Sequence, residues 1–439
     1  MSSRLFNQLF CLTLLTFFLL SCQSTSLLKK AEQKSLDNQI INGRIFSDIF
    51  TGFALYNPEN QTFLYQHESD KYYTPASNTK LYTLYTAMNI LGDTLPLLHY
   101  HQKGDSLFFW GTGNPLFLHP DFEVGSEALD FLKKQSAKLF YIDSQYMDNR
   151  FGPGWSWGDY AYAYQVEKSP MPMYGNLVYF EKRNGGAIQY TPSLAADWTQ
   201  MDPVVRYAFR DEFQNQFQLP YKALTNEYFS DEAPFRTDPQ TLVNLLIDTL
   251  KRPVEYIPRY MPVESETISI PMPDTLYRRF MRSSDNFMGE QLMLMCSDKL
   301  YGMQNSRRAI DYALENLLQD LPDAPVWRDG SGLSRYNLFT PRTMVKLLEK
   351  LYQQVPEERL LDMLPTGGKY GTIANWYGGN PPYVFAKTGT LSNKHCLSGF
   401  VRTNSGKLLI FSFMNNNYIG SSNPVKEQMQ ATLEWIRDN

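Results

Sequence analysis

Cysteine is scarce in this chain, with 4 residues among 439. Cys11 and Cys22 lie in an N-terminal leader, so only Cys296 and Cys396 remain in the body of the protein. Two cysteines are too few for a disulfide scaffold or a cysteine-rich metal site. They can form a single disulfide only if the fold brings them together, and we expect two buried free thiols instead.

The N-terminus lacks an apolar run long enough to cross a bilayer. Leu9 to Leu20 is predominantly apolar but spans only 12 residues, and Arg4 precedes it, which is typical of a signal peptide. Ser21 and Cys22 follow this stretch, and the whole segment resembles a bacterial lipoprotein signal. We therefore expect residues 1–22 to direct export and Cys22 to carry a lipid, which predicts a periplasmic, membrane-anchored protein. The alternative is an ordinary secretory signal with an incidental Cys22.

Neither sign of charge dominates, since 41 Lys and Arg residues stand against 45 Asp and Glu, for a net charge of −4. Nothing in this balance points to nucleic acid as a partner. The five histidines show no paired metal spacing except His99 and His101, which fall on an expected strand. We expect neither a metal nor a cofactor. Hydrophobic residues make up 43% of the chain, enough for a large core in two or three domains.

Hydrophobic periodicity and turn residues predict the order of the elements. A hairpin comes first, followed by a buried helix over 81–91. Short β-like runs and Gly/Pro-rich loops then fill about 99–270, with one helix expected over 128–139. The final third carries strands expected over 383–390, 395–403 and 407–415 and a closing helix over 424–436. We interpret 99–270 as an inserted module.

The stretch from Thr74 to Lys80 carries the first chemical signal. Pro75 suits the first position of a helix, which places Ser77 in the first turn, where free N–H groups favour negative charge. Lys80 follows three residues later on the same face. Burial lowers the pKa of a lysine, and a neutral amine can accept a serine proton. Alone the pair is ambiguous, because a helix start with a solvated lysine looks the same.

Two further motifs remove much of this ambiguity. Ser284-Asp285-Asn286 falls between two helical stretches, where such side chains compete for backbone hydrogen bonds and favour a turn. Lys387-Thr388-Gly389 lies on an expected strand. In this order and in these local contexts, the three motifs form the serine penicillin-recognising set.

The sequence resembles the low-molecular-mass class C penicillin-binding proteins, the D-alanyl-D-alanine carboxypeptidase/endopeptidase family. The resemblance covers most of the mature chain and includes the stretches Gly111–Pro115, Gly152–Asp159, Ser283–Leu292, Asp329–Arg335 and Leu364–Thr372. Ser77 and Ser284 lie 207 positions apart (284 − 77). This spacing favours the family, because an insertion between these motifs is its hallmark.

The resemblance implies a penicillin-binding, β-lactamase-like transpeptidase fold of mixed α/β (α+β) class. An antiparallel sheet flanked by helices would form a discontinuous catalytic domain over residues 23–98 and 271–439. Residues 99–270 would then be a large inserted β-rich module.

The resemblance also implies roles for the motif residues. Ser77 would attack the carbonyl between the two terminal D-alanines of a peptidoglycan stem peptide, with Lys80 as the expected base. Ser284 would relay a proton to the leaving amine, and Asn286 would hold the substrate amide and Lys80. Lys387 would attract the terminal carboxylate.

Further residues would contact the substrate. Thr388, Gly389 and Thr390 belong to the substrate-binding strand, and the backbone N–H groups of Ser77 and Thr390 would form the oxyanion hole. β-Lactam antibiotics would be trapped as acyl-Ser77 adducts. Asp159 is a candidate for the amine of the stem peptide's diamino acid, although a solvated loop aspartate fits the sequence equally well.

Two other functions compete with this interpretation. Gly154 to Gly158 matches the Gly-x-Ser-x-Gly of a nucleophile elbow, which would make Ser156 the nucleophile of an esterase if a strand preceded it and a helix followed. The other is a catalytically idle, cell-wall-binding lipoprotein on the same fold, against which the intact motif residues argue. The sequence does not distinguish carboxypeptidase activity from endopeptidase activity.

Overall fold

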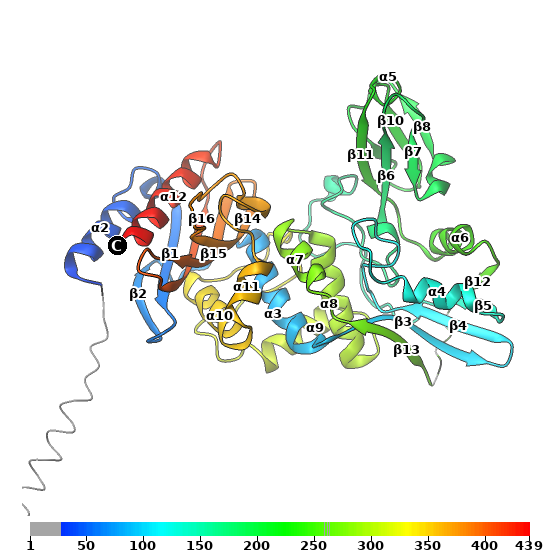
Figure 1. Cartoon of the computed structure of the whole chain (residues 1–439), viewed down its shortest axis with the longest axis horizontal. Helices are drawn as coiled ribbons and strands as arrows, with labels where there is room; N and C mark the ends of the chain where they lie inside the picture. The colour runs from blue at the N-terminus through cyan, green and yellow to red at the C-terminus, as the bar shows by residue number, and fades with distance from the viewer. Residues whose placement is uncertain (1–27, 259, 261, 263) are drawn as a thin grey trace, which may run out of the picture.

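The computed structural model describes residues 28–258, 260, 262 and 264–439. The expected signal segment 1–22 and the expected lipidation site Cys22 lie outside these residues. The chain is of mixed α and β type (Figure 1). Within the described part, none of the helices combines the length and the apolar character needed to cross a membrane.

One body of the molecule is built on a five-stranded antiparallel sheet, in the order β14-β15-β16-β1-β2. Every residue of the central strand β16 is buried, because helices cover both faces of the sheet. The strands are β14 (Val384–Leu391), β15 (Lys394–Arg402), β16 (Leu408–Asn416), β1 (Phe50–Asn57) and β2 (Thr62–His67). The expected hairpin and the three expected C-terminal strands therefore all pair in one sheet.

Two terminal helices, α2 (Lys30–Ile40) and α12 (Asn423–Asp438), cover one face of this sheet (Figure 1). Helix α10 (Pro341–Gln354) packs against the other face of the sheet and also contacts α3 (Lys80–Leu91). Thr340 caps α10 by accepting a hydrogen bond from the backbone N–H of Thr343 at 3.2 Å. The chain ends thus close the sheet on one side and leave the catalytic motifs on the other.

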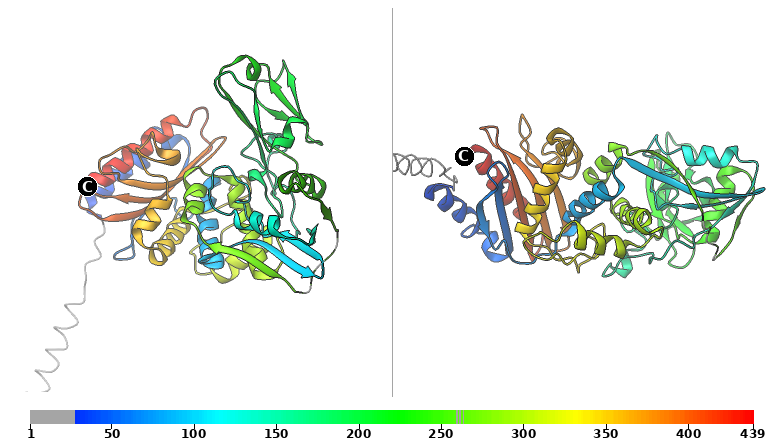
Figure 2. Two further views of the ribbon diagram at one scale, coloured as in Figure 1. Left: turned by 45° about the vertical axis from the view of Figure 1, so that its right-hand side comes forward. Right: turned by 90° about the horizontal axis from the view of Figure 1, so that it is seen from below.

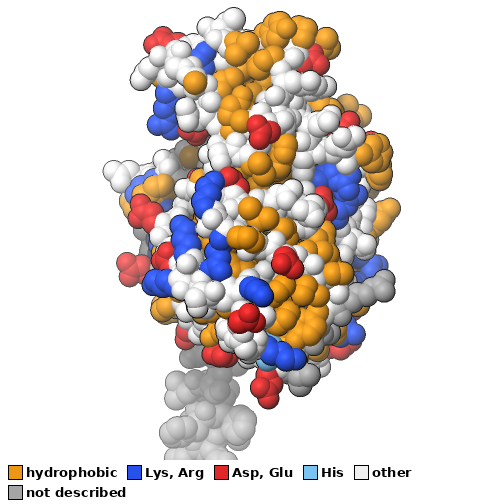
Figure 3. Space-filling model, turned by 90° about the vertical axis from the view of Figure 1, so that its right-hand side faces the viewer, with side chains coloured by type: hydrophobic (Ala, Val, Ile, Leu, Met, Phe, Trp, Pro, Cys, Tyr) orange, Lys and Arg blue, Asp and Glu red, His pale blue; other side chains and the backbone are white. Residues whose placement is uncertain are grey.

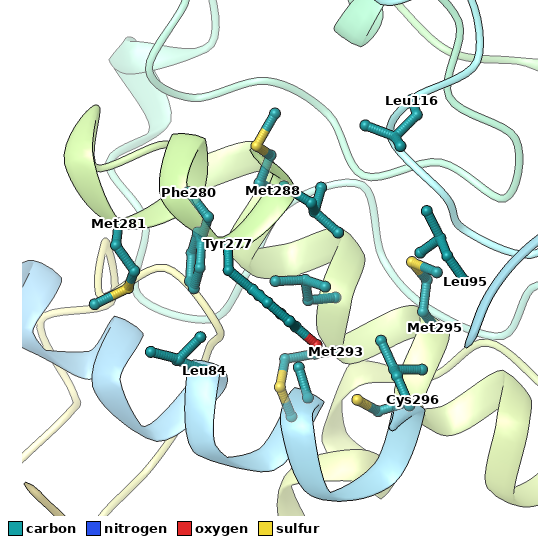
Figure 4. Packing of buried hydrophobic residues seen from close by; sticks show 14 of the residues in the cluster. Leu84, Leu95, Leu116, Tyr277, Phe280, Met281, Met288, Met293, Met295 and Cys296 are labelled. Carbon is teal, nitrogen blue, oxygen red and sulfur yellow. The ribbon is translucent and has the colours of Figure 1, made fainter. Parts of the chain in front are cut away.

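Helix α8 (Asn286–Tyr301) packs against α3, and α7 (Asp274–Arg282) and α9 (Ser306–Asn316) pack against α8. Figure 4 shows Leu84 of α3 near Tyr277 and Phe280 of α7 and Met293 of α8. Most residues of α3 and α8 are buried, as expected for helices enclosed on all sides. This packing fixes the relative positions of the first two motifs.

Cys296 on α8 and Cys396 on β15 are both buried and both free. This confirms the prediction of two buried thiols. Burial is the largest cause that raises the pKa of the Cys396 thiol to about 12, and the Cys296 thiol is raised further by the same cause. Both groups are therefore protonated and unreactive at neutral pH.

The segment between α3 and α7 forms the β-rich part of the molecule, an extension visible in both views of Figure 2. Its main sheet has the order β12-β5-β4-β3-β13, and two three-stranded sheets have the orders β11-β6-β7 and β8-β10-β9. The strands of the main sheet are β3 (Thr94–Lys103), β4 (Ser106–Gly111), β5 (Lys138–Tyr141), β12 (Val254–Tyr256) and β13 (Glu266–Pro271). Those of the small sheets are β6 (Leu177–Lys182), β7 (Gln189–Thr191), β8 (Thr199–Asp202), β9 (Phe209–Arg210), β10 (Phe217–Pro220) and β11 (Phe229–Pro234).

Figure 3 shows the outer face of this segment, where hydrophobic groups alternate with charges of both signs. Short helices complete the chain. They are α4 (Glu127–Lys134), α5 (Lys222–Thr225), α6 (Pro239–Leu250), α11 (Glu357–Met363) and the 3-10 turns η1 (Phe46–Asp48), η2 (Ala76–Thr79), η3 (Trp157–Asp159), η4 (Tyr174–Asn176), η5 (Ser193–Ala196) and η6 (Gly371–Ile373).

The helix expected over 128–139 is shorter than predicted. Helix α4 ends at Lys134, and Gln135 is already extended, with φ −69° and ψ 134°. Residues 138–141 form β5 instead, because Leu139 and Tyr141 are buried and pair in parallel with β4. A pairing partner some thirty positions earlier decided the outcome, which local periodicity does not reveal.

Candidate active site

Ser77 lies on a tight turn rather than in the first turn of an α-helix. A helical turn does begin next to Pro75, as predicted, but it is the 3-10 turn η2 (Ala76–Thr79), and α3 starts only at Lys80. Ala76 has a φ of 49°, in the left-handed region, which the prediction did not include. Such backbone strain in a non-glycine residue is typical of functional sites. Ser77 remains partly exposed while its neighbours on either side are buried.

Two glycines hold this turn in place by close backbone approach. A Cβ on Gly332 would lie 2.0 Å from the Ala76 carbonyl oxygen, and a Cβ on Gly389 would lie 2.2 Å from that of Pro75. Gly389 belongs to the third motif, and Asn78 Nδ2 also donates to the Lys387 carbonyl at 2.8 Å. The strand β14 and the nucleophile turn are therefore in direct contact.

Lys80 is fully buried and points at the nucleophile. Its Nζ lies 3.0 Å from Ser77 Oγ and donates to Asn286 Oδ1 and to the Ser331 carbonyl, both at 2.6 Å. The first two motifs, separated by more than half of the folded chain, thus meet at one nitrogen atom. The sequence predicted each of these side chains, and the fold brings all three together.

Burial lowers the pKa of Lys80 to about 8 from 10.5, partly offset by the charges of Asp329, Asp285 and Glu290. At pH 7 roughly one molecule in ten then carries a neutral amine, against fewer than one in a thousand at the ordinary value. A neutral amine beside a hydroxyl is a general base at hydrogen-bond distance.

The second motif combines a cap, a strained residue and a bridging amide. Asp285 Oδ1 accepts a hydrogen bond from the backbone N–H of Met288 at 2.9 Å and caps α8. Ser284 has a φ of 60°, in the left-handed region. Asn286 Nδ2 donates to the Tyr164 carbonyl at 2.8 Å, so the motif also contacts the β-rich segment.

Lys387 is the buried lysine of the third motif. Its Nζ donates to Ser284 Oγ and to the Thr388 carbonyl, both at 2.8 Å. Burial, followed by the nearby charge of Lys80, holds its pKa well below the ordinary value. Thr390 Oγ1 lies 3.0 Å from His395 Nδ1, and burial lowers the pKa of this histidine to about 3, so it is neutral. The three motifs therefore form one continuous chain of polar contacts.

The loop from Asp329 to Gly332 positions Lys80, the candidate base, through the Ser331 carbonyl. This role was not predicted from the sequence. Asp329 accepts hydrogen bonds from the backbone N–H groups of Gly332 and Ser334, at 2.9 and 2.6 Å, and from Trp155 Nε1 at 2.8 Å. This arrangement aims the Ser331 carbonyl at Lys80. Only the Asp-Gly-Ser-Gly pattern, already part of the resemblance, signalled this loop.

Glu290 lies beneath the same loop and was also missed. Its Oε1 accepts a hydrogen bond from the Ser331 backbone N–H at 2.8 Å, and the side chain is buried. Burial, then the charge of Asp329, raises the pKa of Glu290 to about 7. The available signals were its place in the stretch Ser283–Leu292, which is part of the resemblance, and its position in the middle of a Met- and Leu-rich helix.

Ser77 opens into two adjoining cavities. One of about 190 Å³ is lined by Ser77, Thr388, Thr390 and Lys426 among others, and so combines the third motif with a cation that the sequence did not suggest. The other, of about 420 Å³, is lined by Ser77, Asn286 and Asp159 among others.

The candidate Asp159 therefore faces the same space as the nucleophile. Its carboxylate contacts the neighbouring Tyr164 hydroxyl, whose pKa rises to about 12, first through burial and then through this hydrogen bond. Ser156, Asp159, Tyr164 and Gln165 of the β-rich part form one wall of the larger cavity.

The nucleophile elbow proposed around Ser156 is wrong. Ser156 lies in a loop and is followed by the 3-10 turn η3, and β5, the strand that precedes it in the chain, ends 15 positions earlier at Tyr141. The backbone carbonyl of Ser156 accepts a hydrogen bond from Gln165 Nε2 at 2.8 Å. The strained strand–turn–helix geometry that activates such a serine is thus not what the described residues form.

Within the described residues, no group of three or more His, Cys, Asp and Glu side chains is arranged to hold a metal ion. His99 and His101 lie on β3, and His99 Nε2 is 2.7 Å from Asp298 Oδ2, while its Nδ1 is 2.7 Å from Thr267 Oγ1. This histidine connects β3 with α8 and β13.

Comparisons with known proteins agree with this geometry. A family model described as the D-Ala-D-Ala carboxypeptidase 3 (S13) family matches residues 32–206 and 263–439. The D-alanyl-D-alanine carboxypeptidase DacB of Haemophilus influenzae is 24% identical, over 88% of this chain and 89% of its own length. A D-alanyl-D-alanine carboxypeptidase of Actinomadura sp. (strain R39) is 25% identical, over 81% of this chain and 76% of its own.

The fold has a close solved counterpart. The crystal structure of penicillin binding protein 4 from Haemophilus influenzae superposes with a TM-score of 0.72 at 19% identity, over 92% of this chain and 99% of the other. A second structure of that protein, in complex with a β-lactam, gives 0.66 at 18% identity, over 90% of this chain and 99% of the other. The family match covers most of the chain, confirms the resemblance to class C penicillin-binding proteins, and shows that the chain belongs to the D-Ala-D-Ala carboxypeptidase 3 (S13) family.

Proposed function

We propose that this protein is a serine D-alanyl-D-alanine carboxypeptidase that acts on peptidoglycan stem peptides through an acyl-Ser77 intermediate. One observation carries the proposal. The amine of Lys80, buried and with its pKa lowered to about 8, lies 3.0 Å from Ser77 Oγ. A serine with an amine base at this distance is an activated nucleophile.

The first half-reaction forms the acyl-enzyme. Neutral Lys80 accepts the Ser77 proton as Oγ bonds to the carbonyl carbon of the penultimate D-alanine. The backbone N–H groups of Ser77 and Thr390 stabilise the oxyanion. The C–N bond then breaks, and the proton passes to the leaving amine of the terminal D-alanine, with Ser284 as the relay. Lys387 contacts Ser284 Oγ at 2.8 Å and supplies positive charge near the terminal carboxylate.

The second half-reaction restores the enzyme. Water gives a proton to Lys80 as its oxygen bonds to the acyl carbon. The ester C–O bond then breaks, Lys80 returns the proton to Ser77 Oγ, and the shortened peptide is released as a carboxylic acid. A β-lactam acylates Ser77 in the same way, but its leaving nitrogen stays tethered to the acyl group, so water is excluded. Carboxypeptidase activity is the proposal, and cleavage of D-alanyl cross-links is the variation that the same chemistry allows.

Labelling with a fluorescent penicillin tests this function. The expected result is one adduct per chain, located on Ser77 by peptide mapping, together with release of free D-alanine from a pentapeptide. Folded protein that takes up no label would reject the acyl-serine mechanism and favour the idle binding-protein alternative. Label without D-alanine release, but with cleavage of a cross-linked dimer, would identify an endopeptidase.

Asp159 is proposed to bind the side-chain amine of the stem peptide's diamino acid, because it faces the larger cavity beside Ser77. Replacing Asp159 by Asn should reduce kcat/KM for a diamino-acid peptide about ten- to hundredfold, the usual worth of a charged hydrogen bond. Penicillin acylation should be unchanged. A peptide with that amine acetylated is the matched control, since wild type and variant should hydrolyse it equally; an equal loss on both peptides and on penicillin would reject the role.

We further propose that residues 1–22 export the protein to the periplasm and that a lipid on Cys22 anchors it to a membrane. The support is the leader sequence alone. Cys22→Ser should move the protein from the membrane fraction to the soluble periplasmic fraction without changing penicillin acylation. Unchanged membrane retention of the serine variant would reject the anchor.

A further inference from the structure

A third cavity, of about 230 Å³, lies beside the catalytic cleft and plays no part in the mechanism above. Aromatic side chains dominate its walls, namely Phe151, Trp155, Trp157, Tyr160 and Phe213. They come from two loops of the β-rich segment, one that runs from before η3 to the residue after it and one between β9 and β10. The cavity is therefore a meeting point of two loops.

The bottom of this cavity is formed by a buried ion pair, Arg210 and Glu167, whose charges cancel. Arg210 and Glu167 are both 1% exposed, and their side chains lie 3.7 Å apart. Arg210 donates from Nε to the Pro234 carbonyl at 2.8 Å and from Nη1 to the Asp211 carbonyl at 2.7 Å. Glu167 accepts a hydrogen bond from the Thr237 backbone N–H at 3.0 Å. These partners make the floor rigid.

The charges lining this cavity cancel, because Arg150 and Arg210 stand against Glu167 and Glu212. Arg150 is itself paired with Glu167 at 3.2 Å. An anionic occupant would gain little from a lining of zero net charge that is already paired. A neutral occupant with both apolar and hydrogen-bonding faces fits this lining better.

Two of the wall residues are much more exposed than folding requires. Trp157 is 77% exposed and Phe213 is 69% exposed. Large aromatic groups gain stability by burial, so neither side chain contributes much to the fold in this position. Exposed aromatic side chains at a cavity rim mark a surface for binding.

The cavity adjoins the catalytic cleft. Ser156 and Gln165 line both spaces, and they are hydrogen-bonded to one another through Gln165 Nε2 and the Ser156 carbonyl at 2.8 Å. A substrate held at Ser77 that extends past Asp159 on this side would therefore meet this cavity. An occupant joined to the stem peptide suits such a position.

We propose that the cavity between Trp157 and Phe213 binds a neutral, N-acetylated sugar ring of the glycan strand that carries the stem peptide. This inference rests on the proposed function, because it extends the same substrate beyond the peptide. The C–H faces of a sugar pack on aromatic rings, and its hydroxyl and amide groups pair with the polar rim. The protein would then prefer stem peptides that are still attached to glycan.

The experiment compares one pentapeptide free and the same pentapeptide attached to its N-acetylated disaccharide. Wild type is expected to favour the attached form in kcat/KM by about three- to tenfold, the worth of one or two aromatic contacts. Trp157→Ala and Phe213→Ala should each reduce this preference without changing hydrolysis of the free peptide. Both positions are exposed, so the variants should fold, and unchanged penicillin acylation verifies this.

Tyr221→Ala is the matched control, because Tyr221 is 52% exposed in the same β-rich segment and does not line this cavity. The Tyr221→Ala variant should prefer the attached pentapeptide over the free one to the same extent as wild type. Equal losses on both peptides in Trp157→Ala would show that the cavity binds peptide and would overturn the proposal. Equal rates for both substrates in wild type would overturn it as well.

A binding measurement separates this inference from the proposed function. Calorimetry with the free pentapeptide and with the attached pentapeptide, on Ser77→Ala and on Ser77→Ala/Phe213→Ala protein, requires no catalysis. Binding of the attached form that is about three- to tenfold tighter in Ser77→Ala, and no tighter than the free form in the double variant, supports the sugar site whatever the fate of the acyl-enzyme. Equal binding of the two forms by Ser77→Ala overturns the sugar site and leaves penicillin labelling of wild-type Ser77 as the separate test of the reaction.

Discussion

Replacing Ser77 by alanine is expected to reduce peptide hydrolysis roughly 10⁴- to 10⁶-fold and to abolish covalent labelling by penicillin. The hydroxyl supplies the atom that forms the acyl bond, and nothing else at the turn can replace it. Ser77 is partly exposed, and its hydroxyl contacts Lys80 Nζ. Alanine should therefore leave the thermal midpoint of unfolding nearly unchanged.

The measurements are D-alanine release and the mass of the penicillin-treated protein. Ser156→Ala is the matched control, because Ser156 lines the same cavity and was the rival nucleophile. It should retain full labelling. A Ser77→Ala protein that still gains one penicillin equivalent would show that another residue is acylated.

Replacing Lys80 by methionine is expected to reduce acylation by roughly 10³- to 10⁴-fold, the usual contribution of a general base. Methionine fills similar space but cannot accept a proton. It also leaves Asn286 Oδ1 and the Ser331 carbonyl without the donor they now share. A melting measurement must therefore accompany the kinetics, and comparable melting of the two proteins assigns the loss to chemistry.

The pH dependence of wild type gives an independent view of Lys80. Burial lowers the pKa of Lys80 to about 8, and the active form is the neutral one. The acylation rate should rise about tenfold per pH unit below pH 8 and become level above it. Lys80→Arg stays charged throughout and should show neither the rise nor the plateau. A wild-type rate that falls between pH 6 and 8 would contradict a neutral lysine as the base.

The local sequence was sufficient to predict those strands and helices whose hydrophobic pattern is long and regular. The three C-terminal strands and the closing helix were predicted within a few residues, because each is long, strongly patterned and bounded by turns such as 404–406. The prediction of a single helix over 128–139 was wrong at its C-terminal end because the signal there is not local. Residues 138–141 are a strand only because β4 and β12 lie on either side of them.

The turn at Ser77 was also beyond local reasoning. Pro75 favours a helix start, yet Ala76 is in the left-handed region, and the turn lies so close to Gly332 and Gly389 that a Cβ at either position would clash with it. These glycines are more than 250 positions away in the chain. No local pattern contains a constraint of that kind, and the same is true of the Ser331 carbonyl and of Glu290.

By itself, the sequence determined which residues carry chemistry and in what order, since serine, lysine and amide side chains in three recurring motifs suit one type of reaction. Only the tertiary structure decided how they act. It enclosed Lys80 beside Ser77, where loss of water lowers the pKa of the amine into the working range. It also placed Asp159 and the aromatic cavity next to the nucleophile, because burial, distance and shared cavity walls arise only when distant segments pack together.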